Sequence, residues 1–304
     1  MQNYITLDYN DFETFLRDIS FNGKLYALGI NDHYVFRGQS NAEWSLVPSL
    51  LRMSTKDFLK QVMIEKDIPI LEERFHIECE FVILKSFYKI ANEQGLFVPY
   101  SHVVHSNYHD FFNSRFKLMH PFVWYSEEVE PLAALAQHYG LPTRLLDWTQ
   151  DIFVAIYFAT RGWLGRENCG NSRFVIWMLN KTLVENNIIS SNNDLHLRII
   201  TPSYHLNPFL NAQKGLFTYL QLQSDCIEQM VYAVDRTPVE TLINNMKCST
   251  KGAPLLIKVT IPASEHAKAL YYLLQMGYHA ARLFPGYNGV VKKMTENILL
   301  GRMD

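Results

Sequence analysis

Side chains of several chemistries crowd into one short stretch of this chain. Twelve consecutive residues hold His138, Tyr139, Arg144, Asp147, Trp148 and Thr149, and an apolar segment follows directly. A guanidinium can hold phosphate oxygens through two hydrogen bonds, and an aromatic ring offers a face for stacking. Each residue alone also has a structural reading: the two aromatics as core residues, Arg144 with Asp147 as an ion pair. Their density indicates a site, but it names no reaction.

The elements around this stretch explain how it could be positioned. Gly140-Leu141-Pro142 interrupts the backbone, because proline restricts itself and the residue before it. The next residues, 143–148, predict a short strand, with Thr149 as the N-cap of a helix and Asp151 in its first turn. From Ile152 to Ala159 that helix is apolar on nearly every side, which predicts burial. A buried helix would therefore anchor a strand-to-helix junction that carries the polar groups.

A second candidate position precedes this stretch. The apolar run His33–Gln39 predicts a strand that ends in Arg37-Gly38. An arginine at the end of a buried strand, followed by a residue that is free to turn, can direct its guanidinium into a cleft. The alternative is a surface arginine before a turn.

Composition restricts the class of protein. The chain has 304 residues, 48% hydrophobic, with a net charge of -2, so a broad basic face for sequence-blind nucleic-acid binding is not expected. The four cysteines are far apart, and the histidines form no compact ligand motif, so no metal site is expected. The first residues do not resemble a signal peptide, and no apolar run is long enough for a membrane span. We expect a soluble cytoplasmic protein that does not bind membranes.

The remaining segments predict an α+β fold. Helices are expected at 11–21, 71–90, 265–276 and from Val290, strands at 173–179 and 255–262, and a turn followed by a strand at 211–219. Strands and helices do not alternate strictly, which favours α+β over a doubly wound sheet. We expect one domain over residues 1–304, with 53–130 as a mainly helical insertion.

The motifs of phosphate loops, dinucleotide folds, zinc proteases and serine hydrolases are missing. Four other segments resemble the FRG domain: Phe36-Arg37-Gly38, residues 137–149, Gln213-Lys214-Gly215-Leu216-Phe217 and Leu283-Phe284-Pro285. The resemblance extends over roughly Tyr34 to Thr295. Residues 286–289 depart from it, because relatives tend to carry acidic residues there. Phe209 and Leu210 also stand where an arginine is expected.

The resemblance implies a bacterial protein of a family whose members are in some cases toxins of phage-defence systems. Its layout is similar to the ADP-ribosyltransferase fold, with an antiparallel or mixed sheet, and this implies NAD as a substrate and no metal. The implied catalytic residues are Arg37, Asp147 and Gln213. The implied NAD-binding residues are Arg37, Gly38, His138, Tyr139, Arg144, Trp148 and Thr149.

On this basis we expect an NAD-dependent ADP-ribosyltransferase toxin that modifies RNA, or alternatively a protein. An NAD glycohydrolase, a nuclease and a non-catalytic nucleotide- or protein-binding module are alternatives that the sequence does not separate. A toxin that consumes NAD would harm its own cell, so an antitoxin or another inhibitory partner is also expected. The segment 100–120 is interpreted as a lid or docking surface, or as a plain surface loop.

Overall fold

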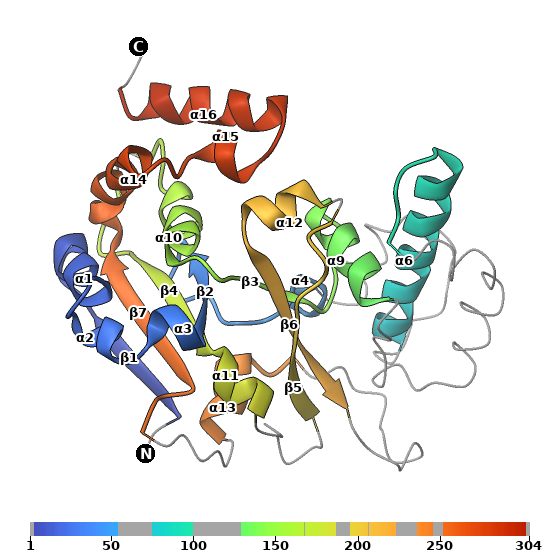
Figure 1. Ribbon diagram of the computed structural model, residues 1–304, viewed down its shortest axis with the longest axis horizontal. Coiled ribbons are helices and arrows are strands. Elements are labelled where there is room, and N and C mark those ends of the chain that lie inside the picture. The colour runs from blue at the N-terminus through green and yellow to red at the C-terminus, as the bar shows by residue number, and fades with distance from the viewer. Residues whose placement is uncertain are drawn as a thin grey trace.

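The computed structural model in Figure 1 describes most of the chain. The described residues are 3–53, 75–99, 129–166, 168–186, 195–205, 207–222, 236–245 and 252–301. The segment 100–120 and most of the predicted insertion at 53–130 lie outside them.

A seven-stranded open sheet forms the centre of the molecule. Its strands are β1 (Tyr4–Asp8), β2 (Tyr34–Gln39), β3 (Leu146–Thr149), β4 (Arg173–Asn180), β5 (Leu195–Ile200), β6 (Gly215–Leu222) and β7 (Leu256–Pro262). The strand order is β1-β7-β4-β2-β3-β6-β5. Only the pairing of β1 with β7 is parallel, and the other neighbours are antiparallel. The predicted α+β class is therefore confirmed.

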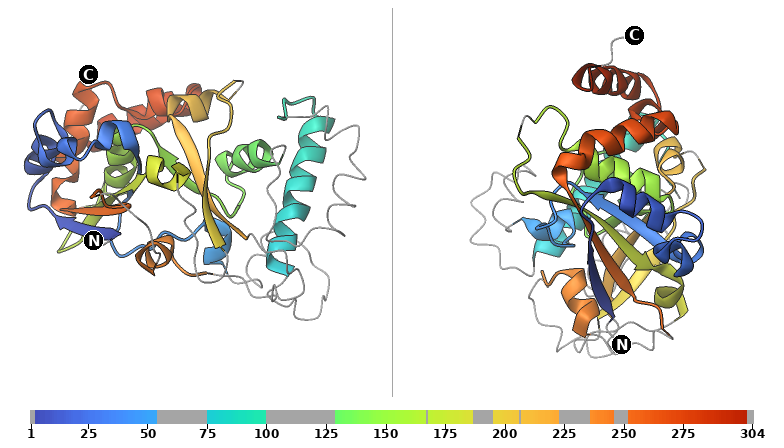
Figure 2. Two further views of the ribbon diagram at one scale, coloured as in Figure 1. Left: turned by 60° about the horizontal axis from the view of Figure 1, so that its bottom comes forward. Right: turned by 90° about the vertical axis from the view of Figure 1, so that its left-hand side faces the viewer.

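Helices cover the sheet from several sides. They are α1 (Phe12–Ile19), α2 (Lys24–Ala27), α3 (Ile30–His33), α4 (Ser49–Arg52), α6 (Phe75–Glu93), α9 (Glu130–His138), α10 (Ile152–Arg161), α11 (Lys181–Asn186), α12 (Pro208–Ala212), α13 (Val239–Asn245), α14 (His266–Gln275), α15 (Ala280–Leu283) and α16 (Tyr287–Leu299). In Figure 1, α10 and α14 lie above the sheet and α11 and α13 below it. Figure 2 shows α6 at the opposite end of the molecule from α1. No helix in the described ranges combines the length and apolarity that crossing a bilayer requires.

The central strand β4 shows why both faces are covered. Phe174, Ile176 and Met178 pack into the core with α1, α10 and α14. The alternate residues, among them Val175 and Trp177, pack into a second core with α11 and α13. Successive side chains of a strand point to opposite faces, so an unbroken apolar run needs a cover on each side.

Helix α10 packs closely against β2. A Cβ atom at Gly38 would collide with the backbone carbonyl of Ala155, so any side chain there would push the helix away. Gly38 lies inside the extended strand, and the prediction that it provides a turn is wrong. The predicted cap also differs, because Asp151 accepts from the backbone N–H of Phe153 and is the N-cap. The Thr149 hydroxyl instead accepts from the backbone N–H of Asp151.

The C-terminal helix α16 is held against α10 by one buried carboxylate. Glu296 accepts from the hydroxyl of Tyr157 at 2.5 Å, from Nε of Arg161 at 2.9 Å and from the backbone N–H of Ala280 at 3.2 Å. The helix begins at Tyr287, three residues before the predicted start. This arrangement brings the segment 283–285 beside α10.

Candidate functional site

The sheet is interrupted between β2 and β3. Strand β2 pairs with β4 along its whole length, from Tyr34 to Gln39, and β3 pairs with β6 from Leu146 to Thr149. By contrast, β2 and β3 share the single registered pair Phe36 with Thr149. Beyond that pair lies a pocket of about 410 Å³. Its lining includes Arg37, Gly38, Trp44, Arg52, Gln137, His138, Asp147, Trp148, Thr149, Phe158, Gln213 and Phe284.

Arg37 occupies the gap between the separated strands. Its Nη1 donates to the backbone carbonyl of Asp147 at 2.8 Å and lies 3.4 Å from Oδ2 of the same residue. The guanidinium therefore satisfies a carbonyl of β3 for which β2 provides no backbone partner. Its Nε is buried and has no hydrogen-bond partner among the described residues. A buried donor without a partner is costly, and this one lies in the wall of a pocket.

Asp147 projects from β3 into the pocket. Its neighbours Leu146 and Trp148 are buried on the other face, whereas the Asp147 side chain is 61% exposed. Oδ1 accepts from Nε2 of Gln137 at 2.5 Å, and the amide oxygen of Gln137 accepts from the hydroxyl of Thr143. Gln137 therefore orients one carboxylate oxygen, while Arg37 lies beside the other.

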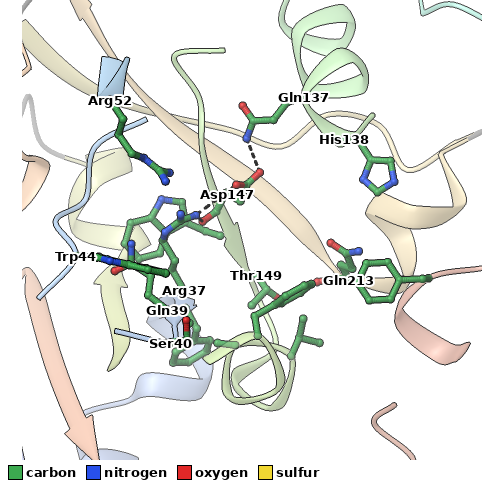
Figure 3. A pocket seen from close by; sticks show the side chains of 17 residues that line it. Arg37, Gln39, Ser40, Trp44, Arg52, Gln137, His138, Asp147, Thr149 and Gln213 are labelled. Atoms are coloured by element: carbon green, nitrogen blue, oxygen red, sulfur yellow. Dashed lines mark hydrogen bonds and ion pairs between the residues drawn. The ribbon is translucent and has the colours of Figure 1, made fainter. Parts of the chain in front are cut away.

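Arg52 adds a second guanidinium to the same pocket (Figure 3). Its Nε donates to the backbone carbonyl of Val47 at 2.8 Å. Desolvation of the guanidinium, and then repulsion from Arg37, lower the pKa of Arg52, although Asp147 opposes this. Two like charges that face one pocket favour the binding of an anion between them.

Gln213 and Thr149 connect the pocket to the C-terminal segment. The Thr149 hydroxyl donates to the backbone carbonyl of Gln213 at 2.7 Å. Nε2 of Gln213 donates to the backbone carbonyl of Leu283 at 3.1 Å. These bonds bring Gln213 to the pocket together with the aromatic rings of Phe158 and Phe284.

His138 lines the pocket on the side opposite Trp44 and Arg52 (Figure 3). Its ring centroid lies 4.4 Å from that of Phe209, so the residue that replaces an expected arginine packs on the histidine. Desolvation lowers the pKa of His138, while Asp147 raises it and Lys292 lowers it to smaller extents. The lowered pKa favours the neutral form of this imidazole.

The structure does not support the predicted NAD-binding role of three residues. Arg144 is outside the pocket: it is only 5% exposed, and its Nε donates to Oε2 of Glu80 at 2.7 Å. Tyr139 is 64% exposed and does not line the pocket either. Trp148 lines the wall but is buried, with Nε1 donating to Thr218, so it offers no open face for stacking.

The sequence did not indicate two of the pocket residues. Trp44 lies in the loop after β2, and Arg52 lies at the end of the short helix α4. Neither belongs to a periodic pattern, and their place in the pocket depends on how this loop folds back. Gln137 and Phe284 lie within the segments that resemble the FRG domain, so that resemblance could have indicated them as site residues.

The comparison with protein families identifies one domain within the chain. The model of the FRG domain matches residues 32–166. This segment is an FRG domain. The FRG domain includes β2, β3 and α10, and with them Arg37, Arg52, Gln137 and Asp147. Gln213 and Phe284 reach the pocket from outside the matched range. No curated protein and no solved structure matches the chain.

Proposed function

We propose that this protein is an NAD-dependent ADP-ribosyltransferase with an ADP-ribosyltransferase-like sheet. The support is the order of three elements. Arg37 belongs to β2, Asp147 to the neighbouring β3, and Gln213 lies two residues before β6, which pairs with β3. The ADP-ribosyltransferase layout implied by the resemblance has three such elements: a first strand with an arginine, a second strand that leads into a helix, and a later element. In this chain β2, β3 and the segment before β6 correspond to them.

One observation carries the proposal. A guanidinium whose Nε has no hydrogen-bond partner in the described part of the chain, and a well-exposed carboxylate, line the same pocket. NAD needs both groups, because its pyrophosphate is an anion and its reaction develops positive charge on the ribose. Arg37, with Arg52 beside it, would bind the pyrophosphate oxygens. Asp147 would face the ribose that carries nicotinamide.

The reaction then follows from these positions. The bond between C1′ of the ribose and the nicotinamide nitrogen breaks, and nicotinamide leaves with the electron pair. The carboxylate of Asp147 stabilises the oxocarbenium-like ribose, and Gln137 keeps that carboxylate in place through its hydrogen bond. A nucleophile of the acceptor forms the new bond to C1′, and Asp147 accepts its proton.

The side of the pocket away from Arg52 suits nicotinamide, the leaving group. Phe158 and Phe284 supply aromatic surface, and Gln213 supplies an amide that can pair with the carboxamide of nicotinamide. The lowered pKa of His138 favours its neutral form, which limits positive charge beside the cationic ring.

The acceptor in this proposal is a cytoplasmic macromolecule, with RNA favoured over protein. The net charge of -2 requires that an RNA be held locally. We further propose a role as a toxin in bacterial phage defence, restrained by an antitoxin or another inhibitory protein.

The test is incubation of the purified protein with NAD labelled in its adenylate phosphate, together with cell extract. Label on macromolecules supports transfer, and sensitivity of that label to ribonuclease or protease identifies the acceptor. Free ADP-ribose alone would identify an NAD glycohydrolase instead. Unchanged NAD in every reaction would contradict the proposal. Asp147→Asn, which preserves shape and removes charge, is the matched control.

A further inference from the structure

The loop after β2 places a tryptophan at the edge of the pocket. Trp44 is 52% exposed and lines the pocket together with Arg37 and Arg52. Figure 3 shows Trp44 and Arg52 on one side, His138 and Gln213 on the other, and Asp147 between them. A large indole that is exposed beside two guanidiniums provides a stacking face next to an anion site.

The loop that carries Trp44 is held at both ends. The backbone N–H of Ala42 donates to the carbonyl of Arg173 at 2.9 Å, and that of Leu46 donates to Oε2 of Glu240 at 3.0 Å. Between these anchors, the N–H of Trp44 donates to the carbonyl of Asn41 at 3.2 Å. A loop fixed in this way loses little conformational freedom when a ligand binds.

Charge decides which half of NAD lies at this side. The nicotinamide ring is cationic before its bond breaks, so the pair Arg37 and Arg52 repels it. Adenine is neutral and can stack on an indole without this penalty. At the other side, the amino group of Lys292 lies over the Phe284 ring, but Lys292 lines a separate hollow beside α16. The two arginines therefore carry the stronger preference.

We propose that Trp44 is the stacking platform for the adenine of NAD, with Arg52 binding the phosphate next to it. This deepens the proposed function and rests on it. Trp44 touches the ligand at the end remote from the reacting C1′ atom. It is therefore a binding and specificity residue, and its contribution appears in affinity for ligands that contain adenine.

The experiment measures binding by calorimetry, with ADP-ribose and nicotinamide mononucleotide as separate probes. Wild type is compared with Trp44→Ala, Trp44→Phe and the control Phe21→Ala. Phe21 is also a strongly exposed aromatic residue, but it lies outside the pocket. Loss of stacking predicts that Trp44→Ala binds ADP-ribose about ten- to a hundredfold more weakly. Trp44→Phe and Phe21→Ala should bind it nearly as wild type does, and nicotinamide mononucleotide should bind all four equally.

Three results would overturn the inference. Unchanged affinity of Trp44→Ala for ADP-ribose would exclude adenine stacking there. Equal loss of both probes would show that the residue only supports the loop. Retained ADP-ribose binding with lost binding of a single-stranded RNA oligonucleotide would assign the indole to a base of the acceptor.

Failure of the proposed function has a different signature. In that case wild type itself binds neither ADP-ribose nor nicotinamide mononucleotide. If wild type binds both and Trp44→Ala does as well, only the adenine platform is wrong.

Discussion

Two arginine–carboxylate pairs each use one residue of the segment 144–147, and they belong to different regions of the molecule. Arg144 and Glu80 are 5% and 0% exposed, and Nε to Oε2 is 2.7 Å. Arg37 and Asp147 are 13% and 61% exposed, and Nη1 to Oδ2 is 3.4 Å. Glu80 also accepts from the backbone N–H of Arg144 at 2.9 Å, which completes a tight buried pair.

The difference shows which pair is available for chemistry. A buried pair in close contact is held by its mutual attraction, and removal of one partner leaves an uncompensated charge. The looser pair faces a pocket, and a partly solvated ion pair contributes little to stability. Arg144 and Glu80 therefore join α6 to the start of β3, whereas Arg37 and Asp147 remain available to a ligand.

The largest effect should come from Arg37→Ala. We expect transfer from labelled NAD to be abolished, because the anion loses its guanidinium, while the free energy of unfolding changes by less than about 1 kcal/mol. Activity assays and urea denaturation of the same preparation check this. If the variant is unfolded, Arg37 has a structural role, as Arg144 does. A folded, fully active variant would remove Arg37 from the site.

Arg144→Ala should show the opposite pattern. We expect a loss of about 3 to 5 kcal/mol in the free energy of unfolding, because Glu80 would remain charged and buried. Activity per folded molecule should persist. If the single variant does not fold, the double variant Glu80→Leu/Arg144→Met, which replaces the pair by apolar side chains, should restore folding. A stable Arg144→Ala with lost activity would reverse the distinction between the two pairs.

Asp147→Asn tests the second member of the exposed pair. If the carboxylate stabilises a cationic transition state, turnover should fall by about a hundredfold or more while NAD binding is largely retained. Stability should change little, since the side chain is well exposed. Measurement of turnover at saturating NAD separates the two effects, and an intact rate would exclude Asp147 from the mechanism.

The smallest effect concerns the titration of His138. Desolvation holds its pKa below the usual 6.5, and Asp147 partly opposes this. Asp147→Asn should therefore lower the pKa of His138 further, whereas Glu80→Gln should leave it unchanged. An NMR titration of the imidazole resonances measures this. An equal shift in both variants would show that the charge of Asp147 does not act across the pocket.

The lowered pKa of His138 also predicts how the free energy of unfolding changes with pH. Well above pH 6.5, the imidazole of His138 is mostly neutral in both the folded and the unfolded state, because the folded pKa is lowered. As the pH falls, the unfolded chain binds a proton first, so stability decreases until the folded pKa is passed. His138→Gln should remove part of that decrease between pH 7 and pH 5 in urea denaturation. An unchanged acid dependence would contradict the desolvation of this imidazole.

Local patterns were sufficient for much of the framework. The apolar runs that predict β4, β7 and α10 appear in the structure at nearly the predicted positions, because burial on one or two faces is recorded in the spacing of apolar residues. Strands β1 and β5 were not predicted. Strand β1 pairs only with β7 at the sheet edge, and β5 only with β6, so each lacks the burial on both sides that makes a strong pattern.

The sequence by itself determined that Arg37 belongs to an apolar strand and that Asp147 precedes a buried helix. Both facts depend on neighbours along the chain. Only the tertiary structure decided that Arg37 meets Asp147 while Arg144 meets Glu80, and that Trp44 and Arg52 share the pocket. Periodicity shows which side of an element is buried. It does not show which distant group packs there, because that depends on strand order and on where the sheet separates.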